Sequence, residues 1–146
     1  MQAAEATLGR VFVLRLGDGD RIPGCLEEFA RERGVQRGFC LLLGGAAGGK
    51  VVVGPRDGEA QIIEPMLAAL AGAHEIAAVG TLFPDEAGAP KLHMHAALGR
   101  GDRPVVGCVR QGVDIWKLGE VILVELHGSM RRAVDPAFGF EVLEVG

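Results

Sequence analysis

Cysteine is scarce in this sequence, which contains only Cys25, Cys40 and Cys108 among its 146 residues. A disulfide framework usually shows a larger and even number of cysteines. The first residues, MQAAEATLGR, also lack the charged start and apolar run of a secretory signal. We therefore expect free thiols in a reducing compartment, which places the chain in the cytoplasm.

Long apolar runs and basic clusters are also missing. No stretch approaches the ~18 apolar residues that a membrane-spanning helix needs, so no membrane partner is expected. The formal net charge is -4, and the longest basic clusters are pairs such as Arg131 and Arg132. Proteins that grip a phosphate backbone usually present a basic face, so nucleic acid is disfavoured as a partner.

The apolar content is substantial, with 49% hydrophobic and 23% charged residues. A chain of this length fits one domain, here residues 1–146, whose core can be stable without disulfides or structural metal ions. Small domains this apolar often hide part of their surface in an oligomer.

Strands outnumber helices in the sequence pattern. One amphipathic helix is expected between Pro23, which suits a helix start, and Gly34, which suits a helix end. The expected strands are residues 10–16, 38–43, 50–53, 62–63, 74–83, 92–98, 105–109, 115–126 and 141–145. Most connections are too short for crossovers, which predicts an α+β fold with a mainly antiparallel β-sheet and one main helix packed on it.

A glycine-rich segment, Gly44-Gly-Ala-Ala-Gly-Gly-Lys50-Val51, comes within one residue of a phosphate-binding loop. Val51 has no hydroxyl for magnesium, and the valines that follow favour a strand over the helix that the motif requires. We interpret the segment as a glycine turn where two backbones pass closely.

Two histidines stand two residues apart in Lys-Leu-His93-Met-His95. Alternate side chains of a strand share a face, so the two imidazoles point the same way with Cβ atoms about 7 Å apart. If Gly101 and Asp102 form the centre of a tight hairpin, His95 lies directly opposite Cys108. Two imidazoles and a thiolate suit zinc and leave a fourth position open. The alternative is that the histidines face solvent and that Cys108 is a small core residue.

Several segments in order resemble the plant-and-prokaryote-conserved (PPC) domain. They are residues 14–16 with the Gly/Asp loop after them, 26–35, 43–46, 74–81, 92–95, 105–112 and 120–123. The resemblance covers residues 10–126 and implies a stand-alone prokaryotic member that assembles as a homotrimer. Plant members carry AT-hooks that enter the DNA minor groove, and this chain has none, because its Arg-Gly-Asp-Arg-Pro letters fall in the expected hairpin turn.

Prokaryotic PPC domains carry H-x-H and then G-G-H-L on this strand pair. The resemblance places the first two histidines at His93 and His95 and the third at Cys108, where Val106-Gly-Cys-Val stands instead. Cysteine can replace histidine as a zinc ligand, so the resemblance implies a metal site of altered character. It is equally consistent with a lost site.

Other polar residues offer weaker candidates. Glu75 and Glu120 fit either carboxylates that support the site or surface charges, whereas His74 and His127 are isolated and fit solvent-facing positions. Trp116 fits the core or a subunit interface better than a stacking surface.

Three functional hypotheses follow. The first is a homotrimeric PPC-like module that binds zinc, another divalent metal or a small ligand through His93, His95 and Cys108. The second is a DNA- or protein-interaction module without metal. The third, ranked last because no catalytic motif is visible, is a metal-dependent enzyme with Glu75 as general base.

Overall fold

Ten strands, one α-helix and one short 3-10 helix make up the part of the chain that the computed structural model describes, residues 1–137 and 139–145. The strands are β1 (Thr7–Gly17), β2 (Arg21–Ile22), β3 (Gly38–Pro55), β4 (Pro65–Ala69), β5 (Ala73–Pro84), β6 (Pro90–Gly99), β7 (Val105–Cys108), β8 (Val113–His127), β9 (Arg131–Asp135) and β10 (Phe140–Glu144). The helices are α1 (Gly24–Arg33) and η1 (Val109–Gln111).

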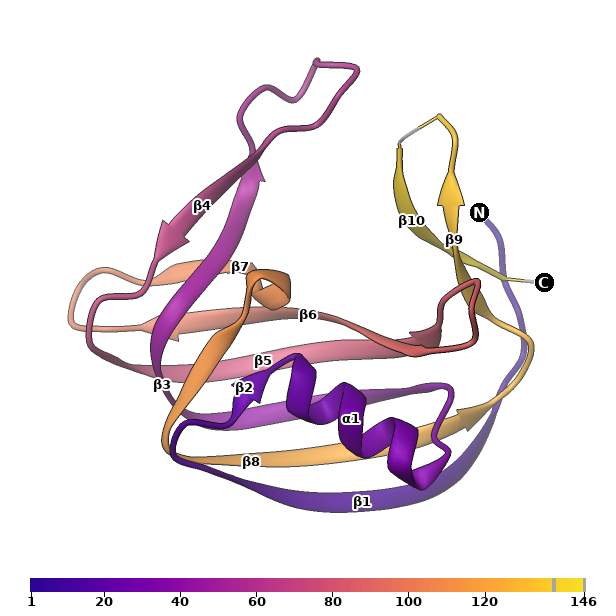
Figure 1. The fold of residues 1–146 in the computed structure, drawn as a ribbon, viewed down its shortest axis with the longest axis horizontal. Helices are drawn as coiled ribbons and strands as arrows, with labels where there is room; N and C mark the ends of the chain where they lie inside the picture. Colours follow the sequence, from indigo (N-terminus) through magenta and orange to yellow (C-terminus); the bar gives the residue numbers. More distant parts are fainter. Residues whose placement is uncertain (138, 146) are drawn as a thin grey trace.

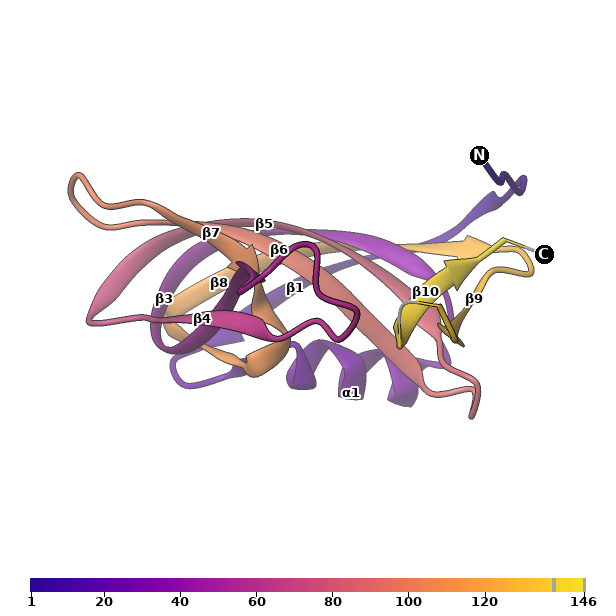
Figure 2. The same cartoon turned by 90° about the horizontal axis from the view of Figure 1, so that it is seen from above.

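The main sheet is antiparallel and follows the order β1-β8-β3-β5-β6-β7, with β2 paired to β8 and β4 paired to β3. Helix α1 packs on one face of this sheet, as Figures 1 and 2 show. Strands β9 and β10 form a separate hairpin, which stands away from the sheet as the β3–β4 hairpin does (Figure 1). The expected α+β class and antiparallel pairing are confirmed.

The helix begins and ends where the sequence predicts. Pro23 occupies the N-cap, and Gly34 takes the left-handed conformation (φ 66°) that lets its N–H donate to the carbonyls of the last turn. Leu26 and Ala30 are buried against the sheet, so the apolar side of the helix faces the core.

Strand β6 shows how the sheet separates core from site. Its even-numbered residues from Leu92 to Leu98 are buried in the core that α1 covers. His93 and His95 alternate with them and point to the opposite, exposed face.

The expected glycine turn within residues 44–49 is wrong, because β3 runs continuously through it. Gly44, Gly48 and Gly49 have positive φ, and the pairing of β3 with β8 shifts register on both sides of Ala46. The close approach of two backbones is confirmed, since a Cβ on Gly45 would lie 2.5 Å from the Trp116 carbonyl oxygen. The glycines therefore bend one long strand instead of reversing the chain.

Because β3 is continuous, residues 44–51 do not form a phosphate-binding loop. Lys50 and Val51 lie inside β3, Val51 is fully buried in the core, and a strand follows where a phosphate loop needs a helix N-terminus.

The expected strands need two further corrections. Ile62 and Ile63 precede a strand without belonging to it, because β4 begins at Pro65. Three observed strands, β2, β4 and β9, have no counterpart among the expected strands. Among the described residues, no helix combines the length and apolar character that crossing a bilayer requires.

Candidate metal centre

The β6–β7 hairpin has the register that the hypothesis requires. Arg103 N–H donates to the Arg100 carbonyl (3.2 Å) across a turn centred on Gly101, with φ 58°, and Asp102. His95 consequently pairs directly with Cys108, as expected from the sequence. A slip of one residue would have moved the thiol to the other face.

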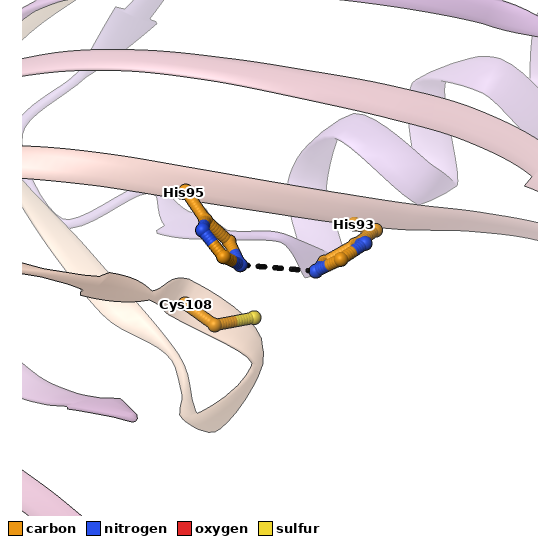
Figure 3. Close-up of side chains that lie close together, drawn as sticks. All are labelled: His93, His95 and Cys108. Carbon is orange, nitrogen blue, oxygen red and sulfur yellow. Dashed lines mark hydrogen bonds between the residues drawn. The ribbon is translucent and has the colours of Figure 1, made fainter. Parts of the chain in front are cut away.

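The three candidate donors converge on one point in space. The Nε2 atoms of His93 and His95 lie 3.1 Å apart, with ring planes at 78° to each other. Figure 3 shows both rings and the Cys108 sulfur turned toward the same space. One donor atom from each residue lies within 4.8 Å of the other two.

This donor set fits a tetrahedral zinc ion in composition and scale. Two imidazole nitrogens at about 2.0–2.1 Å from zinc lie about 3.3 Å from each other, close to the separation of the histidine nitrogens. A thiolate sulfur sits at about 2.3 Å, so the sulfur of Cys108 needs only a small approach to complete three ligands. Three protein ligands leave one coordination position open.

The backbone around Cys108 holds the thiol in place. The residue is 5% exposed, and it pairs with Val52 of β3 as well as with His95 of β6. Gly107 allows this contact, because a Cβ there would lie 2.5 Å from the Val52 carbonyl oxygen. Cys108 is therefore fixed between two strands while its sulfur faces the histidines.

Two arginines, Arg132 and Arg110, place positive charge near the cluster. Partial burial lowers the pKa of His93, and the charge of Arg132 lowers this pKa further, followed by His95 and Arg110. The neutral imidazole that a lowered pKa favours is the form that binds metal ions.

Arg132 is a buried arginine on β9. It is 6% exposed, and its Nη2 donates to the carbonyl (3.2 Å) and hydroxyl (3.1 Å) of Thr81, which pairs with His93. Its guanidinium also lies over the Phe83 ring. Its Nε is buried without a hydrogen-bond partner among the described residues.

The cluster opens into a cavity of about 550 Å³ between the two protruding hairpins. Its polar lining comes from Gln61, Arg110 and the three cluster residues. Its apolar lining comes mainly from Val52, Ile62, Ile63, Pro65, Pro136, Ala137 and Phe140. Cavities of this size and character accept small organic molecules.

The remaining sequence candidates lie elsewhere. Glu75 and Glu120 are exposed, and neither lines the cavity at the cluster. His127 is exposed as expected, but His74 is not solvent-facing: it is buried, and its Nδ1 lies 2.8 Å from the Gly72 carbonyl oxygen. Trp116 is 41% exposed, which leaves an interface role open and rules out a fully buried one.

The cysteines are free thiols, as expected. Burial raises the pKa of Cys25 and of Cys40 to about 11, which keeps both protonated at neutral pH. Neither thiol belongs to the cluster of His93, His95 and Cys108.

Arg110 and Arg132 were missed by the sequence reasoning. Arg110 stands two residues after Cys108, and Arg132 belongs to the basic pair noted above. Neighbouring residues of a strand point to opposite faces, so a strand here would have predicted that either Arg131 or Arg132 is buried. The sequence pattern did not predict β9, and this inference was therefore missed.

Comparison with protein families gives a match over residues 3–127 to the Plants and Prokaryotes Conserved (PCC) domain, abbreviated PPC above. No match is found among curated proteins.

Solved structures share the fold. A metal-containing protein from Archaeoglobus fulgidus is 24% identical, with a TM-score of 0.85 over 97% of this chain and 98% of that one. A PPC protein from Pyrococcus horikoshii is 22% identical, with a TM-score of 0.83 over 99% and 97% of the two chains. A candidate DNA-binding protein from Ralstonia eutropha is 20% identical, with a TM-score of 0.73 over 92% and 90%.

Proposed function

Because the chain belongs to the Plants and Prokaryotes Conserved (PPC) domain family, we propose that it is a single-domain, cytoplasmic, homotrimeric protein that binds a divalent metal through His93, His95 and Cys108. Zinc is the metal that this donor set favours. The open coordination position would accept a small ligand from the adjoining cavity.

The convergence of three donor atoms carries the metal part of this proposal. A cysteine that served only as core would not need its sulfur turned toward two imidazoles. The related metal-containing protein from Archaeoglobus fulgidus supports the same reading, since it shares the fold.

Elemental analysis of untagged protein, purified without chelator and then supplied with zinc, tests the metal site. We expect about one zinc per chain, lost in Cys108→Ala and retained in Cys25→Ala, which removes a half-buried thiol on α1 outside the cluster. Zinc that stays bound in Cys108→Ala would remove the thiol from the ligand set. No zinc in the unmodified protein would overturn the proposal.

The trimeric part rests on an exposed apolar row across the main sheet, on the face opposite α1. The apolar row consists of Val13, Ile122, Leu41 and Val79, which pair side by side on β1, β8, β3 and β5. These side chains are between 46% and 80% exposed. An apolar surface of this kind on a small protein usually marks an interface.

Light scattering coupled to size exclusion tests the assembly. A mass near three times the 15.3 kDa of one chain is expected. A monomer at micromolar concentration would contradict the trimer and leave the apolar row for another partner.

The apolar row also favours a second function, a protein-interaction module without metal. That alternative predicts a metal-free protein whose row is covered by a different chain. The DNA-binding version has less support, because the formal net charge of -4 opposes contact with phosphates.

A further inference from the structure

With a divalent metal bound, the cavity beside the cluster would carry an unbalanced positive charge. A divalent ion held by one thiolate and two neutral imidazoles keeps one net positive charge. Arg110 adds another at the cavity wall, and no aspartate or glutamate is among the described lining residues. A bound anion would offset part of this charge.

Arg110 lines the cavity and has no ion pair with the described residues, so it can contact such an anion. It is exposed on η1, two residues after Cys108, so its Cα lies within about 7 Å of the Cys108 Cα. No carboxylate of the described residues forms an ion pair or hydrogen bond with it. Its neighbour Arg21, by contrast, is already paired with Asp114.

The rest of the cavity is apolar. Ile62 and Ile63 contribute one wall from the β3–β4 connection, and Pro136 contributes to the other from the β9–β10 turn. A molecule bound here would therefore meet the candidate metal donors and a guanidinium at one end and hydrocarbon at the other. The volume suits a molecule of roughly the size of a drug fragment or small metabolite.

We propose, building on the metal site above, that this cavity binds small organic carboxylates with an apolar body, and that Arg110 selects them. The carboxylate is held by the open metal position and the Arg110 guanidinium, and the apolar body lies between the two hairpins. A carboxylate offsets the charge of Arg110, and its two oxygens suit the planar geometry of the guanidinium.

Calorimetric titration of the zinc-loaded protein with benzoate tests the proposal. Benzamide provides a neutral molecule of the same shape, and phenyl phosphate provides a different anion. Benzoate is expected to bind more tightly than either. Arg110→Gln should weaken benzoate binding about tenfold to a hundredfold, as expected for a lost charge-assisted hydrogen bond. Arg103→Gln, an exposed arginine in the hairpin turn outside the cavity, should bind as the unmodified protein does.

Zinc content measured on the same samples separates the two proposals. Equal zinc in Arg110→Gln with weaker benzoate binding supports the assignment. Equal benzoate affinity in both proteins, benzamide binding as tight as benzoate, or a preference for phenyl phosphate overturns it and leaves the metal site standing. Benzoate binding that depends on Arg110 in a protein that takes up no zinc overturns the metal proposal instead.

Discussion

Val79 of β5 and His95 of β6 are directly opposed in the antiparallel pairing, so their side chains lie on the same face of the sheet. The apolar row therefore continues into the candidate metal centre without a break. The complete line across six strands is Val13, Ile122, Leu41, Val79, His95 and Cys108. A partner that covers the apolar row would lie beside the histidines.

A charge placed in this row should break the assembly. Leu41 is 50% exposed at its centre, and Leu41→Glu would bury an unpaired carboxylate in an apolar interface. Light scattering should show a lower mass for Leu41→Glu at the same concentration. Leu143→Glu, at an exposed position on β10 outside the row, should keep the mass of the unmodified protein. An unchanged mass for Leu41→Glu would place the interface elsewhere.

The approach of β7 to β3 should control metal affinity without contributing a ligand. In Gly107→Ala, the new Cβ would lie 2.5 Å from the Val52 carbonyl oxygen and 3.1 Å from the Val51 Cβ, so β7 must move. We expect a destabilisation of about 1–3 kcal/mol and weaker zinc binding, because Cys108 moves with its strand.

Gly99→Ala supplies the control in the same hairpin. Nothing lies within 4 Å of a Cβ at Gly99, so its stability should stay within about 0.5 kcal/mol and its zinc binding should be unchanged. Urea unfolding and competition with a zinc chelator measure the two quantities. Equal zinc affinity in both variants would show that the β3–β7 contact does not position the thiol.

The core under the histidine strand should be sensitive to truncation. Leu98 is fully buried, and Leu98→Ala is expected to lower the free energy of unfolding by about 2–5 kcal/mol. Leu8 is 73% exposed, so the same substitution there should change it by no more than about 0.5 kcal/mol. Chemical denaturation of both variants checks this. Similar losses would mean that the inner face of β6 is not the core.

Acid should destabilise the protein through Glu125. Arg10 holds the pKa of Glu125 at about 2, through bonds from its Nε (2.7 Å) and Nη2 (2.8 Å), whereas an unfolded glutamate titrates near about 4.3. A depressed folded pKa gives stability that is present above the unfolded value and is lost as the pH falls from about 5 to about 2.

Thermal unfolding between pH 7 and pH 2.5 measures this dependence. Glu125→Gln should be less stable than the unmodified protein at pH 7 and should lose less stability on acidification. Glu28→Gln removes an exposed carboxylate whose nearest Arg31 nitrogen is 3.8 Å away, and its pH profile should follow that of the unmodified protein. Parallel profiles for all three proteins would show that Glu125 does not govern acid stability.

The elements that the sequence predicts well are those with local signals. Pro23 and Gly34 bound the helix because each restricts the backbone at its own position. The turn at Gly101 and Asp102 sets the register that brings His95 opposite Cys108, so two site residues follow from one short hairpin. The spacing of His95 and Cys108 left open whether they bind a metal, and the family resemblance implied that they do.

The features that escaped prediction depend on distant partners. The glycines of β3 resemble a turn in isolation, but β8 and β5 pair with them from either side and keep the strand extended. His74 is buried by tertiary packing, which the residues next to it in the sequence do not predict. Arg132 reaches the surroundings of His93 from β9, which pairs with β10 and not with the main sheet in the described part of the chain, so no local pattern links the two residues.

The origin of the cavity's parts has a consequence for ligand specificity. The candidate metal donors stand on paired strands, whereas much of the hydrocarbon wall belongs to the ends of two hairpins. Figure 1 shows these hairpins, β3–β4 and β9–β10, protruding from the sheet. Connections accept substitutions and changes of length far more readily than paired strands do. Substitutions in the two connections should therefore change which small molecule fits the cavity while leaving the three candidate donors in place.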